Sequence, residues 1–145
     1  MTAEHTPRQR WMAILARASR AEIVELVGPH MPDHEVLKAP ETGTVMVEGR
    51  AGGAGRRFNL GEATMTRCVV RLHDGAMGFS YALGRDARKA RLAAILDARL
   101  QVEAPDGALH RDIDALSDRQ NAARDLASRK AAATKVDFFT LVRGA

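Results

Sequence analysis

The fold is decided by residues 42–86, which read TGTVMVEGRAGGAGRRFNLGEATMTRCVVRLHDGAMGFSYALGRD. In this stretch, short apolar or alternating segments are separated by turns that contain glycine, a pattern typical of an antiparallel meander. The segments on either side show helical spacing instead. We therefore predict an α+β fold, in which an antiparallel β-meander of about four to five strands is flanked by N-terminal and C-terminal helices. The expected strands are residues 35–39, 45–48, 57–60, 64–72 and 77–83.

The hairpin made by the last two expected strands has the clearest pattern. Alternate residues of the final strand form one large apolar set and one small set, so the two sets occupy opposite faces. The small set predicts a close approach to a backbone or to a partner. In the preceding strand, Cys68 and Val70 suit a core while Arg67 and Arg71 suit the surface, and Gly75 supplies the tight turn. The large set is Met77, Phe79, Tyr81 and Leu83, and the small set is Gly78, Ser80 and Ala82.

Helix-start signals divide the rest of the chain. Thr6 with Gln9, and Ser19 with Glu22, match the capping-box pattern, and Asp86 is the expected cap of a third helix. We predict a single domain over residues 1–145, with a helical pair at about 6–28, the meander at about 35–84, C-terminal helices at about 86–133 and an apolar tail at 136–145. The residues expected to face inward from the last helix are Leu109, Ile113, Leu116, Ala123 and Leu126.

The tail, VDFFTLVRGA, differs from an ordinary terminus because it is apolar. A disordered terminus is usually polar, yet this one contains two of the four phenylalanines. Two alternatives follow: the tail returns to the meander as an added strand, or it docks onto another protein. The residues expected at such a subunit interface are Phe138, Phe139, Val142 and Arg143.

Composition limits the classes of protein. With 145 residues and 46% hydrophobic content the chain is long enough for a core, although aromatic residues make up only 4%. The single cysteine, Cys68, excludes an internal disulfide and argues against a cysteine-based zinc or iron–sulfur site held by this chain alone. No signal peptide or long apolar run is visible, so a cytoplasmic location is expected. The formal net charge of +4 comes mainly from arginine and favours anionic partners.

One segment has the character of a phosphate site. Successive glycines allow backbone N–H groups to converge on an anion, and neighbouring arginines can close on its charge. The alternative is a flexible hairpin tip with solvated arginines. Cations also crowd the start of the helix after Asp86, where they oppose the helix dipole and indicate an anion or acidic partner nearby. The candidate phosphate-binding residues are Arg50, Gly52, Gly53, Gly55, Arg57 and Arg85.

No catalytic residue or metal site is evident in the sequence. The five histidines lack metal-ligand spacing on one helix face. His30 and His34 are four residues apart, but Pro32 between them argues against a helix that aligns them. No nucleophile, histidine and carboxylate form a recognisable order.

The motifs taken together resemble the PhnG family, a subunit of the bacterial carbon–phosphorus lyase system for phosphonate use. The resemblance spans nearly the whole chain in order, but the segment 104–125 has no matching motif. It rests on Arg8-Gln9, Trp11-Met12, Glu41-Thr42-Gly43, Arg50, Gly52-Gly53, Gly55, Phe58, Gly61, Ala63-Thr64, Thr66-Arg67, Val70-Arg71-Leu72, Asp74-Gly75, Gly78, Ser80, Gly84-Arg85-Asp86, Val136-Asp137-Phe138-Phe139-Thr140 and Val142-Arg143-Gly144.

The resemblance implies an accessory, structural subunit of ribose 1-methylphosphonate 5-triphosphate synthase, a transferase complex. That complex displaces adenine from its substrate ATP with a phosphonate. The implied partners are PhnI, PhnJ and PhnH, with PhnL in the reaction, and an iron–sulfur cluster is expected only on PhnJ. No catalytic residue carries over, and neither nucleic acid nor a membrane is an expected partner. The alternative from the residues alone is a stand-alone basic module that binds phosphate or nucleic acid.

Overall fold

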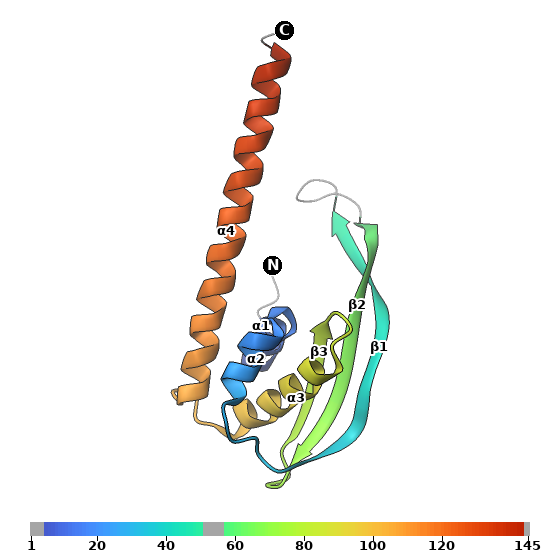
Figure 1. Cartoon of the computed structure of the whole chain (residues 1–145), viewed down its shortest axis with the longest axis vertical. Helices are drawn as coiled ribbons and strands as arrows, with labels where there is room; N and C mark the ends of the chain where they lie inside the picture. Colours follow the sequence, from blue (N-terminus) through green and yellow to red (C-terminus); the bar gives the residue numbers. More distant parts are fainter. Residues whose placement is uncertain (1–4, 51–56, 144–145) are drawn as a thin grey trace.

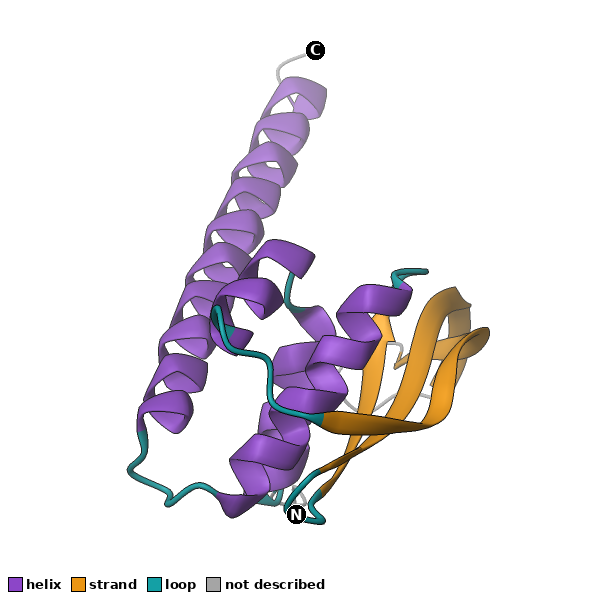
Figure 2. Cartoon of the chain, turned by 60° about the horizontal axis from the view of Figure 1, so that its bottom comes forward, coloured by secondary structure: helices purple, strands orange, loops and turns teal. Residues whose placement is uncertain are grey.

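The computed structural model describes residues 5–50 and 57–143, with side chains for residues 5–47 and 60–133. Figure 1 and Figure 2 show the helices gathered on one face of a curved antiparallel sheet. The sheet has three strands in the order β1-β2-β3. The elements are α1 (Pro7–Arg17), α2 (Arg20–Val27), β1 (His34–Arg50), β2 (Arg57–Leu72), β3 (Met77–Leu83), α3 (Ala87–Val102) and α4 (Ala108–Arg143).

The predicted α+β class is confirmed, but the predicted four to five strands are replaced by three in the described residues. Residues 40–44, expected to separate the first two strands, lie inside β1, and residues 61–63, expected to separate the next two, continue β2. Pro40 is tolerated because β1 is an edge strand, and the register shift between Lys38 and Glu41 absorbs the irregularity. Gly61, with φ 143°, lies opposite Val47 at another register shift, the one between Val47 and Glu48. Residues that are typical of turns therefore lie at irregularities within two long strands.

The small face of β3 packs directly on α3, as the alternation predicted. A Cβ added at Gly78 would lie 1.8 Å from the carbonyl oxygen of Ala94. Two residues further on, the Ser80 hydroxyl donates a 2.6 Å hydrogen bond to the Ala90 carbonyl oxygen. Since Cys68 and Val70 are also buried, α3 and the sheet share the centre of the core.

The predicted helix starts are confirmed. Thr6 and Gln9 form a complete capping box on α1, and Ser19 and Glu22 form one on α2. Asp86 caps α3 by accepting a hydrogen bond from the Lys89 backbone N–H. These caps satisfy N–H groups that the first turn of a helix leaves without an intrahelical partner.

Helix α4 is longer than predicted, with 36 residues that end at Arg143 instead of about residue 133. The tail is therefore the last part of a helix, and the returning strand was the wrong alternative. Leu109, Ile113 and Leu116 are buried as expected. Ala123 and Leu126 are exposed, because the helix has left the rest of the molecule before it reaches them.

Candidate functional site

The predicted phosphate segment lies mostly outside the described residues. Gly52, Gly53 and Gly55 belong to the undescribed part, so their role stays a prediction. The backbones of Arg50 and Arg57 form the final pair of the β1–β2 ladder. Arg85 is exposed and follows the end of β3, where Leu83 pairs with Met65. About 25 Å of strand separates Met65 from Arg57, at about 3.3 Å per residue.

Two of the cations at the start of α3, Lys89 and Arg91, hydrogen-bond to other residues of the chain. The Asp86 carboxylate accepts a hydrogen bond from the Arg20 guanidinium, which lowers the pKa of Asp86. The Lys89 side chain is buried, and its ammonium group donates a 3.3 Å hydrogen bond to the Leu83 carbonyl oxygen. Burial lowers the pKa of Lys89, while Asp86 opposes that shift. Asp86 and Glu22 are the carboxylates whose charge acts on Lys89, and an external anion at this helix end stays a prediction.

The sequence analysis missed Asp97, which organises the interior. Its side chain is only 1% exposed, although it is a carboxylate in the middle of α3. Arg8 of α1 binds both of its oxygens, with Nε 3.2 Å from Oδ1 and Nη2 2.9 Å from Oδ2. The Trp11 indole N–H donates to Oδ1 at 2.8 Å, and the Phe79 backbone N–H donates to Oδ2 at 2.9 Å. The hydrogen bond to Asp97 also raises the pKa of Arg8.

This carboxylate closes one edge of the sheet. The Phe79 N–H lies on β3, whose other side is paired with β2. Gln101, one turn after Asp97, donates a 2.7 Å hydrogen bond to the Met77 carbonyl oxygen. The Arg8 guanidinium also lies 5.4 Å from the centre of the Phe79 ring. One side-chain cluster thus joins α1, α3 and β3 and protects an edge that would otherwise offer free backbone groups.

A sequence signal for this cluster existed. Asp97 interrupts the apolar stripe of its helix, and a buried carboxylate needs a cation and hydrogen-bond donors. Arg8 and Trp11, three residues apart on α1, supply both kinds of donor. Because both residues are far from Asp97 in the sequence, the sequence alone does not show that they bind it.

The far part of the β1–β2 hairpin, which we term the ribbon, contrasts with this closed interior. The ribbon comprises residues 44–50 of β1 and 57–64 of β2, and β3 ends before it. A two-stranded hairpin is only marginally stable in water by itself. Large apolar side chains of the ribbon are exposed, including Met46 at 57% and Leu60 at 62%.

The second exposed extension is the distal part of α4. In the described part of α4, the last hydrogen bond to the body is donated by Gln120 Nε2 to the Ile14 carbonyl oxygen at 3.0 Å. Every residue from 121 to 133 is exposed. In Figure 1, α4 and the ribbon extend from the body toward the same end of the molecule.

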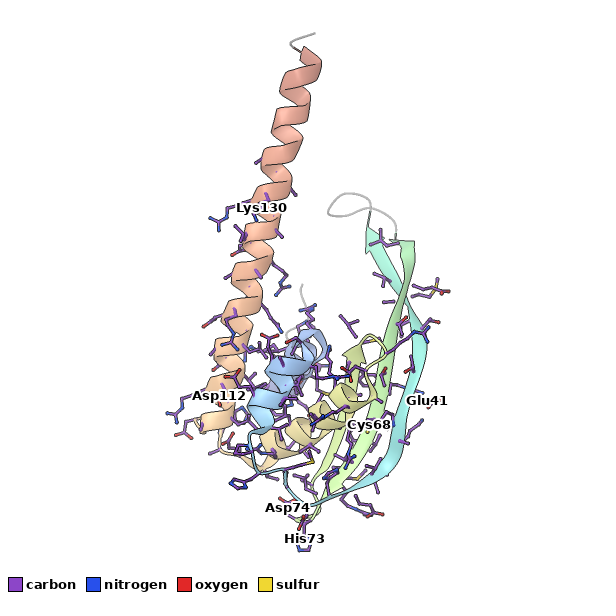
Figure 3. All side chains as sticks on the ribbon, viewed as in Figure 1. Glu41, Cys68, His73, Asp74, Asp112 and Lys130 are labelled. Carbon is purple, nitrogen blue, oxygen red and sulfur yellow. The ribbon has the colours of Figure 1, made fainter. Side chains whose placement is uncertain are left out.

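Two observations on the described residues bear on catalysis. Within residues 5–50 and 57–143, no group of three or more histidine, cysteine or acidic side chains is arranged to hold a metal ion. Cys68 lies between the sheet and the helices (Figure 3), where burial raises the pKa of its thiol. Such a thiol is a packing residue and a poor nucleophile at neutral pH.

These features define an α+β protein with a closed body and two exposed extensions suited to contact with other proteins. A family model described as phosphonate metabolism protein PhnG matches residues 6–144. The chain belongs to the PhnG family, which confirms the resemblance noted in the sequence. It is 44% identical over 145 residues to the alpha-D-ribose 1-methylphosphonate 5-triphosphate synthase subunit PhnG of Rhizobium meliloti (strain 1021), with 94% of this chain and 89% of that protein covered.

Proposed function

We propose that this chain is an accessory, structural subunit of alpha-D-ribose 1-methylphosphonate 5-triphosphate synthase. In this role it belongs to the transferase complex that displaces adenine from ATP with a phosphonate during phosphonate catabolism. The observation that carries the proposal is the near full-length identity of 44% to the protein named as that subunit. The exposed large apolar side chains of the ribbon and of the distal part of α4 support a role in assembly.

The proposed assembly is a cytoplasmic hetero-oligomer with PhnI, PhnJ and PhnH, with PhnL in the reaction. ATP is the substrate of the complex, and any iron–sulfur cluster belongs to PhnJ, because one cysteine is too few to hold one. Among the described helices, none combines the length and apolar character needed to span a membrane.

The end of α4 is the proposed anchor on a partner subunit. Phe138, Phe139, Val142 and Arg143 belong to the last turns of this helix, beyond the part that contacts the body. Burial of a large apolar side chain contributes about 1.5–3 kcal/mol. A few such residues at the tip of an extended helix are enough to make it an effective anchor.

A second role proposed for the same complex is a share in binding the triphosphate at a subunit boundary. It involves Arg50, Arg57 and Arg85 together with the backbone of Gly52, Gly53 and Gly55. Arg57→Ala in the assembled complex should weaken ATP binding, as measured by equilibrium titration. Unchanged affinity would remove Arg57 from this site.

A stand-alone nucleic-acid module is less compatible with the described surface. Several arginines on separate elements already pair with carboxylates, so they form no continuous basic stripe across the described residues. The pairs include Arg8–Asp97, Arg10–Asp114, Arg20–Asp86, Arg67–Glu41 and Arg71–Glu35.

The proposed function is tested by reconstitution. Two preparations are compared: PhnI, PhnJ and PhnH purified with this chain, and the same three subunits purified without it. Adenine release from ATP is then measured in the presence of PhnL and methylphosphonate. Adenine release should require the chain and return when it is added back. Full release in its absence would contradict the proposal, and release by the purified chain alone would show that it is an enzyme in its own right.

A further inference from the structure

The two edges of the sheet differ in how their backbone groups are used. On β3, the Phe79 N–H donates to Asp97 and the Met77 carbonyl oxygen accepts from Gln101, so this edge is closed. β1 forms the opposite edge and has a neighbouring strand, β2, on one side only. In Figure 1, β1 is the outermost strand, and no described element lies beyond it. The backbone groups on its outer side can therefore pair with another strand.

The hydrogen bonds of the sheet show which residues of β1 direct these groups outward. In an antiparallel ladder, the N–H and C=O of one residue point to the same side, and the side alternates along the strand. The Thr64 carbonyl oxygen accepts a 2.8 Å hydrogen bond from the Gly84 N–H, so the backbone groups of Thr64 point away from β1. Thr44 is opposite Thr64, so its own N–H and C=O point to the free edge. By the same alternation, Thr42 and Met46 point outward as well.

The first part of β1 is protected against strand addition, whereas its middle is not. Lys38, Pro40 and two register shifts precede Glu41, and features of this kind discourage an edge from pairing with another chain. From Glu41 to Val47 the register with β2 is unbroken. Glu41 is the one charged residue of this segment, and its carboxylate lies 3.5 Å from Lys38 and 3.4 Å from Arg67 of its own chain. The segment therefore offers a regular edge without an uncompensated charge.

The segment is also complementary to itself. Thr44 is the central residue between Glu41 and Val47, and it is one of the residues that point outward. A two-fold axis at Thr44 places Thr44 opposite its own copy and Thr42 opposite Met46, so every outward residue meets another outward residue. Glu41 then lies opposite Val47, and no like charges face each other within the segment. Threonine pairs across two strands are themselves favourable.

We propose that this edge binds a second copy of the chain, through antiparallel pairing of the two Glu41–Val47 segments. The two sheets become one continuous sheet. Pairing also supports the ribbon, because two strands alone are marginally stable and the copy provides two more at this position. Met46, 57% exposed in the single chain, gains a cross-strand neighbour. The inference goes beyond the proposed function, since it concerns contact of the chain with itself.

The described residues favour a copy over an extended strand of another subunit. Backbone pairing alone does not distinguish the two, because any extended chain carries the same backbone groups. A copy, however, has a regular segment of the same length, with its outward residues in matching positions and its single charge already compensated. The match therefore follows from this chain alone and requires no property of an unknown strand.

The test compares two proline substitutions in the full-length chain. Thr44→Pro removes an N–H that points to the free edge and leaves the β1–β2 ladder its bonds. Val36→Pro is the matched control, because Val36 is opposite Val70 and its N–H also points outward, but in the protected part of β1. Analytical ultracentrifugation of the chain without other subunits measures the dissociation constant of the dimer. Circular dichroism and urea unfolding check that both variants fold.

The wild-type chain should form a dimer. Thr44→Pro removes two donors from the symmetric pair, so it should raise the dissociation constant by about tenfold or more, while Val36→Pro should change it by less than about twofold. A second pair of variants tests the register without proline. Thr44→Cys should give a disulfide-linked dimer on oxidation with copper phenanthroline, because residues that face each other in a hydrogen-bonded pair are about 5.5 Å apart. Val36→Cys should stay unlinked.

The outcomes are distinct from those of the proposed function, because the dimer is measured without other subunits. A wild-type chain that stays monomeric, or a dimer that Thr44→Pro leaves intact and Thr44→Cys does not link, would overturn the inference. A monomeric chain whose binding to PhnI, PhnJ and PhnH is weakened by Thr44→Pro would also overturn it, and would assign the edge to an extended strand of one of those subunits. Failure of the reconstituted synthase to require the chain would overturn the proposed function alone.

Discussion

The body and the two extensions of this protein differ in how their side chains are buried and paired. In the body, α3 lies against the backbone of β3, and Asp97 closes the edge of the sheet. Across the described residues, no buried side-chain polar atom lacks a hydrogen-bond partner. In the ribbon and the distal part of α4, large apolar side chains such as Leu60 and Leu126 are exposed instead.

The difference shows that stability and assembly depend on separate residues. A substitution in the body should lower the free energy of unfolding, since it opens a cavity, a clash or an unpaired polar group. A substitution on an extension removes little that the folded chain uses by itself, so it should affect assembly.

The largest loss of stability is expected from Asp97→Ala. The substitution leaves the Trp11 and Phe79 N–H groups without an acceptor and removes the partner of Arg8. Each buried N–H group left without an acceptor costs about 1–3 kcal/mol, whereas the Arg8 side chain, 39% exposed, is rehydrated when it loses its partner. Urea unfolding of the isolated chain measures the effect. Asp114→Ala is the control, because its pair with Arg10 is exposed and worth at most about 1 kcal/mol. Equal effects of the two substitutions would contradict the role of Asp97.

A smaller loss is expected from Gly78→Ala. The added Cβ would clash with the Ala94 carbonyl oxygen, so β3 or α3 has to shift. Overpacking of this kind costs about 1–3 kcal/mol. Gly43→Ala on the same sheet is the matched control, because its Cβ would meet no atom within 4 Å. A Gly78→Ala protein with the wild-type unfolding midpoint would show that the contact between α3 and β3 is loose.

The smallest effect concerns Lys89 and appears as a pH dependence. Burial lowers the pKa of Lys89 in the folded state below its unfolded value of 10.5. In the alkaline range between the two pKa values, the unfolded state therefore binds more protons, and this group makes stability rise with pH. Lys89→Met should remove that rise. Unfolding free energies of both proteins between pH 8 and pH 10.5 give the difference, and parallel curves would contradict the prediction.

The sequence predicted the elements that depend on near neighbours. The capping boxes at Thr6 and Ser19 involve residues three positions apart, and the two faces of β3 follow from strand periodicity. Both were confirmed because no distant part of the chain competes with them.

The sequence failed where distant residues decide the outcome. Pro40 and Gly61 indicated turns, but pairing along two long strands turned both into irregularities of a continuous ladder. Asp97 was missed because its partners, Arg8 and Trp11, belong to the first helix of the chain. The tail was expected to leave the helix, yet no glycine or proline occurs between Ala108 and Arg143 to end it.

The sequence predicted the kind of site, a subunit interface, but not the shape of the element that carries it. An apolar C-terminal segment indicated a subunit interface, and the residues at its tip remain the proposed anchor. The prediction that Leu126 faces inward was wrong, since this side chain is 48% exposed. Only the position at which α4 leaves the body, after Gln120, shows that this leucine is free to meet a partner.

The separation of body and extensions is tested most directly by native mass spectrometry after co-expression with PhnI, PhnJ and PhnH. It compares the full-length chain with a chain that ends at Lys135 and lacks the anchor. The full-length chain should be recovered in a hetero-oligomer. The shortened chain should be recovered alone, with the urea midpoint of the full-length protein. A shortened chain that assembles normally, or one that no longer folds, would contradict the separation of body and extensions.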